Sequence, residues 1–249
     1  TTAELDKAIE LFPKECIYMR WHYEDPTTLP HRLLLDWYEK TGLKVMAATA
    51  ASYGESPYMP RHNSRAQIIK DFSSLVKKNK LCGILATAWD DGSPHLETVV
   101  RGFIAQGEYG WNPNGRSVDE FITAHAQREL GLTKNQMSFL ADLEESAFFF
   151  DGALVVSGRR NPSWQVQLDF ELISLPDKES NGAWSEKYKG KLDSAKIEAN
   201  RMIKIKEGLK QAKMHATGSR YTLDIYEQNA CLFNYPTQLL LTLEKYDKA

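Results

Sequence analysis

The stretch LCGILATAWDDGSPHLETVVRGFIAQGEYGW, residues 81–111, contains a strand, a loop and a helix in that order. Residues 81–89 are almost all apolar and predict a buried β-strand. Asp90 to His95 form a polar loop, and a helix is expected from about Leu96 to Tyr109. An apolar strand followed by a helix is typical of a parallel sheet covered by helices.

The same pattern occurs twice before residue 81. Residues 16–23 predict a first strand, and residues 32–40 predict a helix with Leu33, Leu34, Trp37 and Tyr38 at helical spacing and Gly42 as its C-cap. Residues 44–50 predict the second strand, and Asn63 or Ser64 is expected to cap the next helix. Each step has the length of a βαβ unit. A (β/α)₈ TIM barrel has eight steps, so we expect about three of them here, from the C-terminal part of such a barrel.

The chain changes character after about residue 115. Ser117-Val-Asp-Glu120 predicts a capping box, and helices are expected over residues 134–150, 184–215 and 222–246, with Pro236 as a candidate kink. The prediction is therefore a barrel portion over residues 1–115 and an α-helical bundle over residues 116–249.

Charge and composition exclude several classes of protein. The net charge is −2 and the isoelectric point is about 6.3, so no basic nucleic-acid footprint is present. The sequence has no apolar run of membrane-spanning length, and residues 1–12 predict an amphipathic helix rather than a signal peptide. Three scattered cysteines do not suggest disulfides or a zinc site, and we expect Cys16 and Cys82 to be small buried side chains in strands. No cofactor or metal is predicted.

Aromatic and acidic residues gather where the three strands end. Strand ends on the C-terminal face of a barrel carry the active site. Here they supply Trp21-His22-Tyr23-Glu24-Asp25, then Tyr53-Gly54-Glu55, then Trp89-Asp90-Asp91 with Glu97 further on. Aromatic rings pack against the C–H faces of sugars, and carboxylates accept hydrogen bonds from hydroxyls. The alternatives are core packing for Trp21 and Trp89, a turn for Asp90 and Asp91, and a structural role for His22.

The third strand also carries a family resemblance. Gly83-Ile-Leu-Ala-Thr-Ala-Trp89-Asp90-Asp91, followed by Glu97 and by Gly102-Phe-Ile-Ala-Gln-Gly-Glu-Tyr-Gly-Trp111, resembles the end of the catalytic barrel in family 20 glycoside hydrolases, the β-N-acetylhexosaminidases. Trp21 is similar to the family's sixth-strand tryptophan and Tyr53 to its seventh-strand tyrosine. Asp91 stands where the family has a glutamate, and Tyr53-Gly54-Glu55 replaces a Tyr-Leu-Asp pattern.

The resemblance implies a hydrolase acting on terminal N-acetylhexosamine-type sugars. The implied substrate-binding residues are Trp21, His22, Tyr53, Trp89, Asp91 and Glu97. The family's catalytic Asp-Glu pair follows the fourth strand, which would lie in a missing N-terminal half of the barrel, so no catalytic residue is expected here and the chain alone should be inactive. The family also implies a periplasmic or secreted location.

Two alternatives remain open. A different barrel glycosidase would use Asp91 or Glu97 together with Glu24. A non-catalytic carbohydrate-binding or assembly module would bind glycans without turnover. In the leading interpretation, three strands alone leave open edges that invite aggregation. We therefore expect the missing half of the barrel or a second copy of the chain to cover them.

Overall fold

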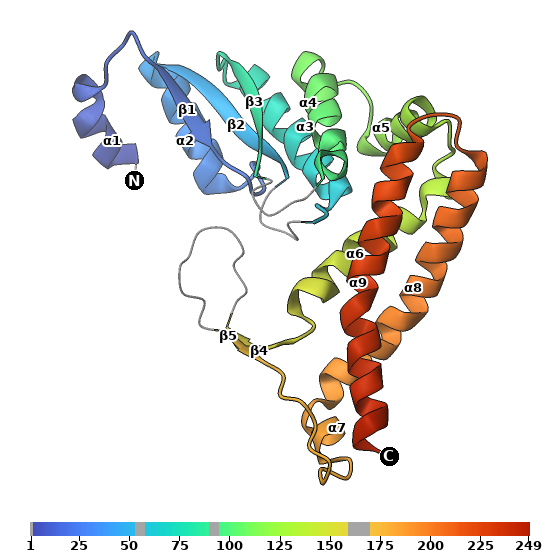
Figure 1. The fold of residues 1–249 in the computed structure, drawn as a ribbon. Coiled ribbons are helices and arrows are strands. Elements are labelled where there is room, and N and C mark those ends of the chain that lie inside the picture. Colours follow the sequence, from blue (N-terminus) through green and yellow to red (C-terminus); the bar gives the residue numbers. More distant parts are fainter. Residues whose placement is uncertain (1, 53–57, 90–94, 159–169) are drawn as a thin grey trace. The chain divides into compact units, whose positions relative to one another are not determined.

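A computed structural model describes residues 2–52, 58–89, 95–158 and 170–249 (Figure 1). The chain forms two compact units. The first combines Thr1–Gly54, Pro60–Asp90 and Val99–Ile122. The second combines Glu55–Met59, Asp91–Thr98 and Thr123–Ala249. Two short segments that follow the second and third strands thus belong to the second unit.

The first unit is a parallel sheet with alternating helices. Its elements are α1 (Thr2–Ala8), η1 (Ile9–Leu11), β1 (Ile17–Trp21), α2 (Leu29–Thr41), β2 (Lys44–Ser52), α3 (His62–Lys78), β3 (Gly83–Ala88) and α4 (Val100–Trp111), and α5 (Val118–His125) begins in it. The strands pair in parallel in the order β1-β2-β3. This confirms the predicted mixed α/β class with its parallel sheet.

The three helices that follow the strands lie on one side of this sheet (Figure 1). On that side Ala47 of β2 packs into a core with Leu35 of α2 and with Phe72 and Leu75 of α3. Side chains alternate between the two faces of a strand. The opposite face carries the exposed apolar side chains of the outer strands: Ile17, Met19, Trp21 and Leu85. No described helix of the first unit covers that face.

Two glycines allow this packing. Gly42 ends α2 with φ 69°, the left-handed conformation expected of its C-cap position. Gly102 lies where α4 crosses β2. A Cβ atom there would lie 2.5 Å from the carbonyl oxygen of Ala51. Only a residue without a side chain lets α4 come this close to the sheet.

The capping box before α5 is confirmed. The backbone N–H of Ser117 donates to the Glu120 carboxylate at 2.7 Å, and the N–H of Glu120 donates to the Ser117 hydroxyl at 3.2 Å. These reciprocal hydrogen bonds satisfy donors that a helix start leaves without partners.

The second unit is largely helical. It contains η2 (Leu96–Thr98), the π-helical turn η3 (Ala126–Leu130), η4 (Asn135–Met137), α6 (Phe139–Gly152), β4 (Val155–Gly158), β5 (Phe170–Leu172), α7 (Ala183–Lys187), α8 (Lys189–His215) and α9 (Arg220–Asp247). The long helices α8 and α9 run side by side (Figure 1), and together with α6 they bury a core that includes Leu143, Ile205, Leu209, Leu223 and Phe233. The predicted C-terminal helical region is confirmed. No helix in the described part of the chain is long and apolar enough to cross a membrane.

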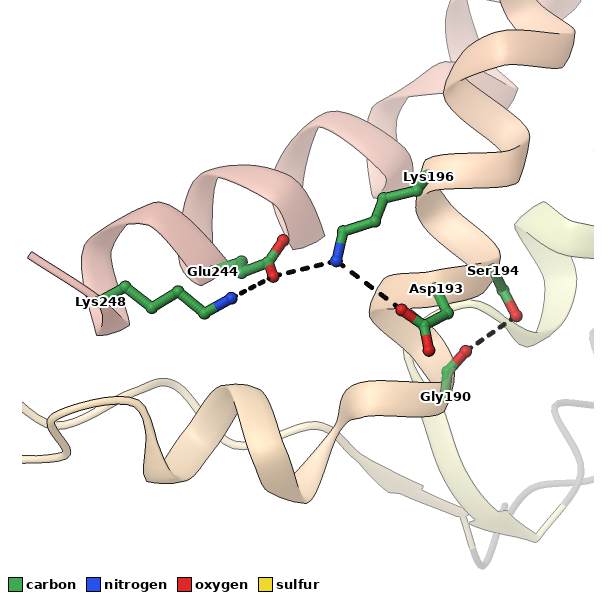
Figure 2. A network of polar contacts seen from close by, with 6 residues as sticks. All are labelled: Gly190, Asp193, Ser194, Lys196, Glu244 and Lys248. Atoms are coloured by element: carbon green, nitrogen blue, oxygen red, sulfur yellow. Dashed lines mark hydrogen bonds and ion pairs between the residues drawn. The ribbon is translucent and has the colours of Figure 1, made fainter.

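Ion pairs connect α8 to the end of α9, as Figure 2 shows. Lys196 Nζ lies 3.1 Å from Glu244 Oε1, and Lys248 Nζ lies 2.6 Å from the same oxygen. Lys196 also faces Asp193 at 3.7 Å. The hydrogen bond from Lys248 is the main reason why the pKa of Glu244 is lowered. Such pairs contribute little individually, about 0–1 kcal/mol when exposed.

Several local predictions were wrong. The helix expected from Leu96 to Tyr109 is divided into η2 and α4. Arg61, not Asn63 or Ser64, is the N-cap of α3, and no side chain caps this helix. Leu33 is exposed, and Leu35 takes its expected place in the core. Cys16 and Cys82 lie just outside the strands and are exposed, because β1 and β3 begin one residue later than each cysteine.

The second unit departs from prediction in two places. The pair β4–β5 is an antiparallel ladder that was not expected. The helix expected over residues 184–215 is interrupted at Tyr188, whose ring packs on Trp184 at 5.1 Å and whose hydroxyl accepts a hydrogen bond from the N–H of Ser174 at 3.1 Å. By contrast, α9 continues through the buried Pro236.

Candidate functional site

Three aromatic side chains meet at the carboxyl end of the three-stranded sheet. The ring centroids of Trp21 and Trp89 are 5.5 Å apart, and Tyr23 lies 6.0 Å from each of them. These separations and the tilted ring planes are those of favourable aromatic contacts. We call Trp21, Tyr23 and Trp89 the aromatic cluster.

The geometry of the strands explains why these rings meet. Trp21 is the last residue of β1, and Trp89 directly follows β3, so the two come from the outer strands with β2 between them. Trp21 is in register with Ala48. Ala48 and Ala50 are fully buried, and their methyl groups leave room for rings from both sides to meet across β2. The small residues of the middle strand therefore allow the cluster to form.

The cluster is packed but remains accessible. Trp21 is 46% exposed and Trp89 is 43% exposed. A half-exposed indole combines a defined position with a free flat surface, which suits the C–H face of a pyranose ring. The cluster lies at the carboxyl edge of a parallel sheet, where ligands bind in α/β folds.

The loop after β1 is held in shape by an aspartate. Asp25 Oδ1 accepts hydrogen bonds from the backbone N–H of Thr27 at 2.8 Å and from its hydroxyl at 2.6 Å. The hydroxyl hydrogen bond and then the backbone hydrogen bond lower the pKa of Asp25. This carboxyl group is therefore ionised near neutral pH and is a poor general acid.

His22 belongs to a different set of contacts. Its ring stacks on that of His31 with centroids 3.9 Å apart and planes 11° apart, and both rings meet Phe72 edge-on. His31 is 3% exposed, and its Nδ1 lies 2.9 Å from the carbonyl oxygen of Pro26. Burial is the main cause that lowers the pKa of His31 to about 4. These contacts favour the structural interpretation of His22.

Buried arginines support this end of the sheet. Arg65 of α3 donates from Nη1 to the carbonyl oxygen of Tyr23 at 2.8 Å. Arg101 of α4 donates from Nη2 to Asn63 Oδ1 at 3.4 Å. Both side chains are buried. Arg65 thus holds the backbone of Tyr23, one of the three residues of the aromatic cluster.

The structure brings together two of the six predicted substrate-binding residues, Trp21 and Trp89. His22 stacks on His31 instead, and Glu97 lies in η2 of the second unit. Tyr53 and Asp91 lie outside the described residues. Tyr23 was not predicted as a site residue, although its position two residues after Trp21 indicates the same side of the chain.

The described residues contain no group of three or more histidine, cysteine, aspartate or glutamate side chains able to hold a metal ion. No protein-family model matches the chain, and a search of curated proteins gives no match.

Proposed function

We propose that the chain forms the C-terminal part of the catalytic barrel of a glycoside hydrolase that resembles the β-N-acetylhexosaminidases of family 20. The substrates would carry a terminal N-acetylhexosamine-type sugar, and the aromatic cluster would form one wall of the sugar pocket. The observation that carries this proposal is the convergence of Trp21 and Trp89 from separate strands, 5.5 Å apart at the carboxyl edge.

The arrangement of the sheet supports a barrel. Parallel crossovers are almost always right-handed, so strands in sequential order place their helices on one side. A doubly wound sheet reverses its order and carries helices on both sides. Here the order is β1-β2-β3 and the helices share one side (Figure 1). The uncovered apolar face with Ile17, Met19 and Leu85 then corresponds to a barrel interior, to be closed by the missing half or by a second copy.

The chemistry of the site supports binding rather than proton transfer. The aromatic cluster offers flat surfaces, and Asp25, in the loop after β1, is ionised and accepts hydrogen bonds from Thr27. In this proposal the catalytic Asp-Glu pair comes from the missing half, and the chain alone binds sugar without hydrolysing it. A periplasmic or secreted location belongs to the same proposal.

The test measures binding of N-acetylglucosamine to the purified chain by ligand-observed saturation-transfer NMR. We expect saturable binding that Trp21→Ala weakens at least fivefold, because that variant removes one stacking surface. Tyr235→Ala is the matched control, since Tyr235 is an exposed aromatic side chain on α9 of the other unit. Equal binding by all three proteins would refute the sugar-wall assignment.

Hydrolysis distinguishes the remaining alternatives. We expect no release of chromophore from an N-acetylglucosaminide by the chain alone. Turnover that disappears in Asp91→Asn would replace this proposal with a barrel glycosidase that uses its own carboxylates. Sugar binding by a natural protein that encodes no upstream barrel strands would instead indicate a carbohydrate-binding module.

A further inference from the structure

A pocket lies at the amino end of β3, whereas the aromatic cluster lies at the carboxyl end of the sheet. It has a volume of about 330 Å³, is open to solvent, and is lined by the end of α3, the start of β3 and the end of α4. All of its lining residues belong to the first unit. Small-molecule sites usually measure about 300–1,000 Å³, so one sugar-sized ligand fits.

The apolar part of this pocket includes an unusually exposed tryptophan. Trp111 ends α4 and is 93% exposed. Val76, Leu81 and Ile84 line the pocket beside it. An indole this free of packing contributes little to the fold, whereas its flat face is available to a ring-shaped ligand.

The polar part of the pocket provides a cation. Lys77 lines the pocket and has no ion pair among the described residues, whereas Lys80, which also lines it, is paired with Glu39 at 3.0 Å. Ser73 is 3% exposed, and its hydroxyl has no hydrogen-bond partner in the described part of the chain. This oxygen is buried behind the pocket wall, so Lys77 is the polar group that a ligand can reach.

We propose that this pocket binds an acidic sugar residue of the hexuronate type. The pyranose ring lies against the Trp111 indole, and the carboxylate pairs with the Lys77 ammonium. An anion without a ring would leave the indole unused, and a neutral sugar would leave Lys77 without its partner. The combination of indole and ammonium therefore selects a sugar that carries a carboxylate. The proposal does not depend on the glycosidase assignment.

The experiment follows the indole N–H signals of the ¹⁵N-labelled chain during a titration with D-glucuronate. The signal of Trp111 is identified as the one that Trp111→Phe removes. We expect this signal to shift saturably at millimolar concentration. Lys77→Ala should weaken binding at least fivefold. Lys78→Ala is the matched control, because Lys78 is the next residue of α3 and does not line the pocket; it should bind as the unaltered chain does.

Three results would overturn the proposal. A Trp111 signal that does not move up to about 50 mM glucuronate, roughly fifty times a dissociation constant of 1 mM, excludes the site. Glucose that binds as tightly as glucuronate excludes the role of Lys77. Inorganic phosphate that gives the same shift and affinity excludes a site for a sugar ring. None of these results bears on N-acetylglucosamine binding at the aromatic cluster, so the two proposals can fail separately.

Discussion

His31 should make the stability of the chain depend on pH between about 6.5 and 4. Its ring is buried against His22 and Phe72, and because a carbonyl oxygen only accepts, the contact with Pro26 places a proton on Nδ1. Burial lowers the pKa of His31 from 6.5 to about 4; the Pro26 hydrogen bond opposes this, and the neighbouring charges of His22 and Arg20 add to it. The folded chain therefore resists protonation that the unfolded chain accepts.

The sign and size of the effect follow from linkage. As pH falls below 6.5, the unfolded chain binds this proton first, and the folded state loses stability. The loss is complete near pH 4, where the folded state is protonated as well. A pKa difference between 6.5 and about 4 corresponds to about 3 kcal/mol. Asp25, whose pKa is lowered, loses its contribution only at lower pH.

His31→Asn isolates this contribution, because asparagine keeps an N–H donor near the Pro26 carbonyl and does not titrate. Urea unfolding of both proteins from pH 7 to pH 4 gives the difference between their free energies of unfolding. We expect the unaltered chain to lose about 3 kcal/mol of stability relative to the His31→Asn variant as pH falls. An NMR titration of the His31 ring gives its pKa directly. A difference that stays constant with pH, or a ring that titrates near 6.5, would show that the reasoning is wrong.

Three further predictions concern packing and helix capping. Gly102→Ala should destabilise the chain by about 1–3 kcal/mol, because the added methyl group meets the backbone of β2. Gly107→Ala in the same helix is the control and should not destabilise the chain, because a methyl group there meets nothing within 4 Å. Urea unfolding of the two variants gives the comparison. A double-mutant cycle on Trp21→Ala and Trp89→Ala should give a coupling of about 0.5–1.5 kcal/mol, and a value near zero would mean that the rings do not interact. Hydrogen bonds from Ser117 lower the pKa of Glu120. The start of α5 should therefore fray as pH falls and this carboxyl group becomes protonated, which faster exchange of the amide protons of α5 would report. Glu120→Gln should show no such pH dependence.

Local signals located the strands of the first unit and some of its helix ends. Apolar runs of strand length predicted all three strands, and Gly42 and the capping box gave helix ends that the structure confirms. The N-cap of α3 and the division between η2 and α4 were missed locally, and the other errors concern contacts across the fold. The helix break at Tyr188 coincides with a hydrogen bond between its hydroxyl and the N–H of Ser174, a contact that no local sequence pattern predicts. The strand β5 has only three residues, too few for a period-2 pattern.

The candidate site was only partly predictable for the same reason. Trp21 and Trp89 follow from their places at strand ends, but their meeting depends on the register of three strands and on the volume of β2. His22 was expected to contact sugar. Its stacking on His31 was not expected, because His31 lies on α2, nine positions further along the chain, and such stacking has no sequence signature. The placement of Tyr53 and Asp91 is not part of the described structure.

Ala48 and Ala50 have a consequence for the evolution of specificity. Since these alanines lie on the strand between the two that carry the indoles, the space in which the rings meet depends on their volume. Both positions are fully buried, so one or two added carbons at either alanine would push the rings apart. The separation of Trp21 and Trp89 can therefore change through the middle strand alone, without a substitution at either tryptophan.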